Sequence, residues 1–186
     1  MNRVRNDKNK TYATQPEGCG YHNFYSSITE VKIYNKMIPK NYYSIKFIED
    51  HLSFLDQTKL PLKEIYVVTD DYERIAVAIE KLELRGAPLI GISAAFALAL
   101  SFKSVSSNHY EHFNKVYKRL ASTRPTAVNL FYALDKMKKV FQSISDFSNT
   151  YQSLIDEAVA IYTFEEHCSN KMAEHGFNIF TKKSNV

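Results

Sequence analysis

Residues 86–102 read Gly-Ala-Pro-Leu-Ile-Gly-Ile-Ser-Ala-Ala-Phe-Ala-Leu-Ala-Leu-Ser-Phe, an uncharged stretch between Arg85 and Lys103. As a helix it would be about 25 Å long at ~1.5 Å per residue, shorter than the ~30 Å hydrocarbon core of a bilayer. It is rich in alanine rather than leucine and includes Ser93 and Ser101. These features predict a helix buried on all sides inside a bundle, and not a membrane span.

Amphipathic helical patterns lie on both sides of this apolar stretch. The preceding pattern begins at Asp70, which with Glu73 resembles a capping box, and we expect it to end at Gly86. Pro88 suits the first turn of the apolar helix. Further helices are expected over about 108–121, from Pro125 onward, and from about Asn149 to Phe180. The residues expected to face inward include Ile75, Ala78, Ile79 and Leu82, then Phe113, Val116, Tyr117 and Leu120, and then Val128, Phe131, Leu134 and Met137.

Strand-like alternation comes before the helices. Residues 43–48 and 51–55 alternate in polarity on either side of Glu49-Asp50, which is typical of a β-hairpin. Residues 64–68 supply a third strand. The predicted fold class is therefore α+β, with a small N-terminal antiparallel sheet followed by a bundle of about five helices.

Composition limits the classes of partner. The chain has 186 residues, 45% hydrophobic and 24% charged, which suits a globular domain and excludes a disordered protein. Of the net charge of +4, about +3 lies in the first ten residues, so the folded body lacks the basic face of a nucleic-acid binder. Cys19 and Cys168 match no metal-ligand spacing, and we expect a cytoplasmic protein without metal or cofactor.

Two arginines directly precede predicted helix starts. Arg85 stands before Gly86 in Leu84-Arg-Gly-Ala-Pro88, and Arg124 stands before Pro125 in Ser122-Thr-Arg-Pro-Thr126. A helix start exposes unpaired N–H groups and the positive end of the helix dipole, and an arginine fork adds a charge-assisted hydrogen bond to an anion. An arginine near a helix start is more often a solvent-exposed residue without a binding role, so each segment by itself is only a candidate anion site.

Other polar groups give weaker signals. Asp56 in the loop after the second strand either serves a site or makes a turn. His109 and His112 share a helical face, but no third metal ligand is in reach. Cys168 lies in a polar cluster whose members spread over several helical faces. No nucleophile–base pair stands out, and we assign no catalytic or metal-binding residue.

Four segments together resemble the S-methyl-5-thioribose-1-phosphate isomerase family. They are Leu55-Asp-Gln-Thr-Lys-Leu-Pro61, Arg85-Gly-Ala-Pro-Leu-Ile-Gly91, Thr123-Arg-Pro-Thr-Ala-Val-Asn-Leu130 and Glu174-His-Gly176. Their order and spacing are similar to those of the family, over about residues 43–180. Related proteins are the ribose-1,5-bisphosphate isomerases and the regulatory subunits of translation initiation factor 2B.

The resemblance implies an aldose–ketose isomerase of methionine salvage, which converts methylthioribose 1-phosphate to methylthioribulose 1-phosphate without a known metal. It implies that Arg85, Gly86, Ala87 and Arg124 bind the phosphorylated substrate. The family's catalytic Cys, in a Thr-His-Cys-Asn motif, and its catalytic Asp belong to a second, Rossmann-like domain that would begin near Val186. Cys168 is not in that motif and receives no catalytic role.

These implications lead to an expected domain organisation. Residues 1–42 would be a mostly flexible leader, residues 43–163 the sheet and helical bundle, and residues 164–186 a terminal helix and stub before the missing catalytic domain. We expect a shortened isomerase-like protein that is inactive alone. The alternatives are a regulatory module like the initiation-factor subunits, or half of a split enzyme that associates with a complementing chain through its exposed apolar surface.

Overall fold

The computed structural model describes residues 42–181, with side chains placed as far as Ile179. The predicted leader, residues 1–42, lies outside the described residues except for Tyr42. The remaining description concerns the compact unit that begins at Tyr43.

The described strands form one antiparallel sheet in the order β1-β2-β3, made of β1 Ile45–Ile48, β2 His51–Leu55 and β3 Tyr66–Thr69. The predicted hairpin is confirmed, because Ile48 pairs with His51 across the two-residue turn. Glu49 and Asp50 both have positive φ, which is the backbone conformation of a tight hairpin turn whose twist matches the strands.

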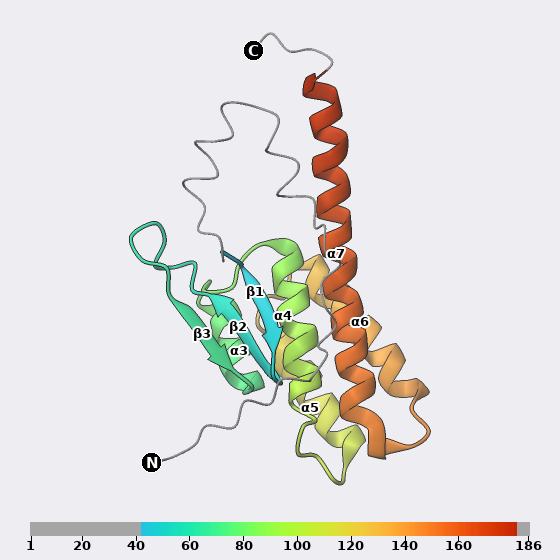
Figure 1. The fold of residues 1–186 in the computed structure, drawn as a ribbon. Helices are drawn as coiled ribbons and strands as arrows, with labels where there is room; N and C mark the ends of the chain where they lie inside the picture. The colour runs from blue at the N-terminus through green and yellow to red at the C-terminus, as the bar shows by residue number, and fades with distance from the viewer. Residues whose placement is uncertain (1–41, 182–186) are drawn as a thin grey trace, which may run out of the picture. The chain divides into compact units, whose positions relative to one another are not determined.

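Five α-helices follow in the described part of the chain, which confirms the predicted α+β class. They are α3 Tyr72–Glu80, α4 Ala87–Leu100, α5 His109–Ala121, α6 Val128–Ser143 and α7 Thr150–Thr181, with the short 3-10 helix η1 Phe147–Asn149 before α7. Every residue of α4 from Ile90 to Leu100 is buried, and α4 packs against α3, α6 and α7 (Figure 1). The apolar stretch is thus a central helix, and no helix among residues 42–181 is long and apolar enough to cross a membrane.

Helices α4 and α6 run parallel, so both begin at the same end of the bundle. Near their starts, Gly91 of α4 lies against the backbone of Asn129 in α6. Near their ends, the rings of Phe102 and Phe141 are 5.6 Å apart. Helix α7 runs in the opposite direction and extends beyond the other helices (Figure 1). We call the segments 56–58, 85–91 and 123–130 the motif end: Gln57 contacts Arg85, and Gly91 lies against Asn129.

Two predicted boundaries of α3 are wrong. Asp71, and not Asp70, caps this helix, since its side chain accepts a hydrogen bond from the backbone N–H of Glu73 at 2.9 Å. The helix ends at Glu80 and not at Gly86, and Leu82 takes the left-handed conformation two residues after that end. Leu82 therefore points away from the core and is 44% exposed.

The predicted start of α6 is also wrong. Pro125 does not open the helix but occupies the second position of a turn, in which the N–H of Ala127 donates to the carbonyl of Arg124 at 3.0 Å. The helix begins three residues later and rotates its buried face accordingly. Val128, expected to face inward, is 79% exposed, whereas Leu130 and Ala133 are buried.

Candidate functional site

The start of α4 is open to solvent. Gly86 is the N-cap residue, with φ 106°, and Arg85, Gly86, Ala87 and Pro88 are all exposed. A Cβ at Gly86 would find ample space, so glycine is required there by its backbone conformation and not by crowding. No side chain caps this helix start. Its first N–H groups therefore remain available to an external acceptor.

Arg85 is held by the side chain and the backbone of Gln57. The Nε of Arg85 donates to Gln57 Oε1 at 3.2 Å, and Nη2 donates to the Gln57 carbonyl at 3.4 Å. In return, Gln57 Nε2 donates to the Arg85 carbonyl at 3.1 Å. All of these acceptors are neutral, and among the described residues no carboxylate pairs with Arg85. Its positive charge is therefore not compensated within this part of the chain.

The loop that carries Gln57 is shaped by Asp56. The buried Asp56 carboxylate accepts hydrogen bonds from the backbone N–H of Thr58 at 2.9 Å and from its hydroxyl at 2.6 Å. Burial opposes ionisation of Asp56, but the hydrogen bonds from Thr58 and the charges of Lys59 and Arg74 together outweigh it and hold the pKa of this carboxyl below its usual value. Of the two roles considered for Asp56, the structure shows the turn.

Arg124 lies in the loop between α5 and α6. Buried Thr123, just before it, donates from its hydroxyl to the Leu120 carbonyl at 2.6 Å, and Arg124 itself accepts from Ala127 through its backbone. The Arg124 side chain is half-buried. Its guanidinium makes no hydrogen bond or ion pair with any side chain placed in the structure. An arginine so placed offers its full set of donors to a ligand.

The starts of α4 and α6 are brought together by Gly91. A Cβ on Gly91 would lie 2.6 Å from the backbone oxygen of Asn129 and 3.4 Å from the Cβ of Ala133, so only glycine permits this approach. Parallel helices that start side by side direct two positive dipole ends toward the same region. Among the described residues the Glu174–Gly176 segment takes no part in these contacts: Glu174 pairs with Lys171 of its own helix, and nothing lies within 4 Å of a Cβ at Gly176.

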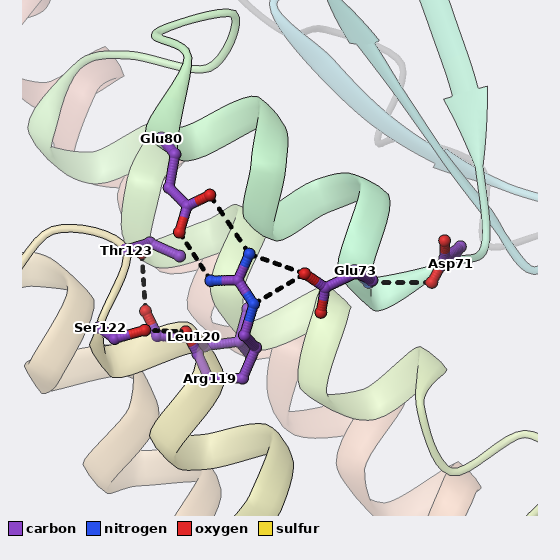
Figure 2. Close-up of polar contacts among 7 residues, drawn as sticks. All are labelled: Asp71, Glu73, Glu80, Arg119, Leu120, Ser122 and Thr123. Carbon is purple, nitrogen blue, oxygen red and sulfur yellow. Dashed lines mark hydrogen bonds and ion pairs between the residues drawn. The ribbon is translucent and has the colours of Figure 1, made fainter.

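The other two arginines of residues 42–179 have acidic partners. Arg74 pairs with Glu83. Figure 2 shows Arg119 between Glu73 and Glu80: its Nε donates to Glu73 at 2.7 Å and its Nη1 to Glu80 at 2.7 Å. The hydrogen bond from Arg119 lowers the pKa of Glu80, and hydrogen bonds to Glu80 and Glu73 raise the pKa of Arg119. Within residues 42–179, Arg85 and Arg124 are thus the arginines whose charge has no acidic partner.

The weaker candidates lie elsewhere. His112 accepts or donates through Nε2 to the Ser101 hydroxyl at 3.1 Å and packs edge-on against Phe102, and burial lowers its pKa. No group of three His, Cys, Asp or Glu side chains gathers as a potential metal site among the placed side chains. Sequence reasoning missed Gln57. The only signal was its position in the Leu55–Pro61 segment, because a glutamine in a loop has no distinctive chemistry.

Comparison with family models matches residues 83–186 to the Initiation factor 2 subunit family. A methylthioribose-1-phosphate isomerase of Dehalococcoides mccartyi is 40% identical over 140 residues, which cover 73% of this chain and 42% of that protein. The isomerase of Caldicellulosiruptor saccharolyticus is 39% identical over 146 residues, covering 76% and 42%. The chain thus spans 42% of the length of each of these relatives.

Solved structures show the same similarity. A crystal structure of 5-methylthioribose 1-phosphate isomerase from Pyrococcus horikoshii matches with a TM-score of 0.62 and 31% identity, over 68% of this chain and 37% of that one. Subunit delta of translation initiation factor eIF-2B from A. fulgidus matches with a TM-score of 0.55 and 33% identity, over 63% and 36%. Both an enzyme and a translation factor subunit therefore share this arrangement of sheet and helices.

Proposed function

The chain belongs to the Initiation factor 2 subunit family, and from this premise we propose that it is the phosphate-anchoring part of a methylthioribose-1-phosphate isomerase. In this proposal Arg85, Gly86, Ala87 and Arg124 bind the phosphate of methylthioribose 1-phosphate. The reaction served is the aldose–ketose isomerisation to methylthioribulose 1-phosphate in methionine salvage.

One observation carries the proposal: Arg85 and Arg124 are the arginines of residues 42–179 that lack an acidic partner, and each lies beside a helix start. A phosphate carries up to two negative charges and several acceptor oxygens. Arginine forks and exposed helix N–H groups are the donors that bind it most strongly in proteins. Gly86 leaves the backbone bare at the start of α4, so a phosphate oxygen can approach Ala87 closely.

We propose further that residues 1–186 bind the sugar phosphate without converting it. Moving a proton or hydride between C1 and C2 requires positioned acid and base groups. The motif end offers guanidinium groups, which donate hydrogen bonds and accept none, and the Asp56 carboxylate is already engaged by Thr58. The cysteine and aspartate that the family resemblance assigns to catalysis have no counterpart among the residues of the motif end.

The test is a titration of the full chain with methylthioribose 1-phosphate by calorimetry, joined to an NMR assay for product. We expect binding, no product, and an affinity about tenfold or more weaker in Arg85→Gln and in Arg124→Gln, because each loses a charge-assisted hydrogen bond. Lys139→Gln, which removes the same charge from the exposed face of α6, should bind like the wild type. Equal affinity in all three variants would contradict the proposed site.

A second candidate is an interaction module, as in translation initiation factor eIF-2B. It is favoured by large apolar side chains that are exposed along α7 from Phe164 onward, among them Met172 and Ile179. Such surface is typical of protein contacts, including those with a complementing chain. Sedimentation velocity distinguishes the two: an assembly whose formation is unaffected by Arg85→Gln and Arg124→Gln, without sugar-phosphate binding, would support the module.

A further inference from the structure

Gln57 contacts Arg85 through both ends of its side-chain amide. We propose that Gln57 is a positioning residue, which directs the Arg85 guanidinium toward the bound phosphate while leaving its charge uncompensated. The inference rests on the proposed function, because it assigns a second residue to the same phosphate site.

The amide of Gln57 is oriented by the groups around it. Its Oε1 faces Arg85 Nε, which only donates, and its Nε2 faces the Arg85 carbonyl, which only accepts, so one orientation of the amide satisfies both. The backbone N–H of Gln57 donates to the Glu83 carbonyl at 3.0 Å. Both the backbone and the side chain of Gln57 therefore bind the segment that leads into α4.

This arrangement leaves most of the guanidinium free. Arg85 uses Nε and one N–H of Nη2 for Gln57, whereas both N–H groups of Nη1 contact no acceptor among the described residues. A guanidinium has five N–H donors in a fixed plane, so holding one edge sets the direction of the other. The edge that Gln57 does not use is the one available to a phosphate.

Gln57 is neutral, so it holds Arg85 without balancing its charge. Arg119 shows what a carboxylate does in the same fold: Glu73 and Glu80 take up its donors and balance its charge. A glutamate at position 57 would keep an acceptor for Arg85 Nε, but it would compete with phosphate for the positive charge and could not donate to the Arg85 carbonyl. An amide both accepts and donates without adding charge.

The experiment follows the Arg85 Nε–H signal in the NMR spectrum of the full chain, assigned by its loss in Arg85→Lys, with sulfate as the probe. Gln57→Glu should keep this N–H protected from solvent exchange but bind sulfate about tenfold or more weakly. Gln57→Leu should lose the protection, with exchange about tenfold faster, and weaken sulfate binding less than Gln57→Glu does. The control is Gln142→Glu, the same change at an exposed site near the end of α6, which should alter neither.

The outcomes separate the two claims. If sulfate shifts the Arg85 signal of the wild type and Gln57→Glu binds it equally well, the role of Gln57 is overturned and the proposed function stands. If sulfate leaves the wild-type signal unmoved at every concentration, the proposed function is overturned, and the role of Gln57 with it. A purely structural role would affect stability in Gln57→Leu but would not single out the charged variant for weaker sulfate binding.

Discussion

Arg119 and Arg124 lie five positions apart in the chain, but they have opposite surroundings. Arg119, in the last turn of α5, joins that helix to α3 through Glu73 and Glu80 (Figure 2). Arg124, in the next loop, meets no acidic side chain of the part of the chain that the structure describes, and the same is true of Arg85 at the start of α4. Where carboxylates of the fold surround an arginine, it holds helices together. Where only neutral groups surround it, its charge is left for a molecule outside the fold.

Backbone contacts support the two regions differently. The last carbonyls of α5 accept hydrogen bonds from the hydroxyls of Ser122 and Thr123, so the loop after Arg119 is closed by its own side chains. At the motif end the helix starts have no side-chain caps and depend on the close approach of Gly91 to Asn129. The two helix starts are therefore held together by packing, whereas Arg119 links α5 to α3 by charge.

The largest effect is expected when the packing of the motif end is broken. In Gly91→Ala the new Cβ would collide with the Asn129 carbonyl, a backbone atom that cannot turn aside. Overpacking of this kind costs about 1–3 kcal/mol of unfolding free energy, even though alanine favours a helix. Gly176→Ala is the matched control, since nothing lies within 4 Å of its new Cβ, and it should be neutral or stabilising. Urea denaturation of both variants measures the difference, and equal stability would show that α4 and α6 can separate freely.

The next largest effect is expected at Arg119. In Arg119→Gln the charge that links Glu73 and Glu80 is lost, and we expect a cost of about 1 kcal/mol. The value stays modest because the carboxylate side chains are 47% and 39% exposed and screened by solvent. Thermal and urea unfolding test it. A variant as stable as the wild type at low salt would mean that α3 and α5 are held by their apolar contacts alone.

The contribution of this ion pair should depend on pH. The pKa of Glu80 is lowered in the folded protein, chiefly by the hydrogen bond from Arg119. The folded state therefore binds its proton less readily than the unfolded state does, so the stabilisation is complete above the ordinary glutamate pKa and is lost as the pH falls through the lower folded value. The difference in unfolding free energy between wild type and Arg119→Gln should therefore become smaller from pH 6 to pH 3. We expect this decrease to be less than about 1 kcal/mol. A difference that stays constant over this range would show that packing and not charge produces it.

The smallest effect on stability is expected at Arg124. Its guanidinium has no partner among the described residues, so Arg124→Gln should change the unfolding free energy by no more than about 0.5 kcal/mol. The same substitution is expected to weaken sugar-phosphate binding about tenfold. Compared with Arg119→Gln, this variant should show the opposite behaviour: Arg119 contributes to stability, and Arg124 contributes to binding. A large loss of stability in Arg124→Gln would assign it a structural role instead.

Local patterns were sufficient for the elements but not for their ends. Alternation predicted the hairpin, and the uncharged stretch predicted a buried helix, because both depend on which side chains leave water. The ends of α3 and α6 depend on competition between backbone hydrogen bonds. The capping by Asp71, the left-handed Leu82 and the turn at Pro125 each moved a boundary, and the last also turned Val128 out to solvent.

The α+β class, the central helix α4 and the two arginines before helix starts could all be predicted from local sequence, since each depends on neighbouring residues. Which arginines have an acidic partner could not be predicted in this way. Glu73 and Glu80 lie 46 and 39 positions from Arg119, and Gln57 lies 28 from Arg85. Ion pairs and hydrogen bonds act over a few ångströms, so the packing of helices and loops, and not the order of residues, selects their partners.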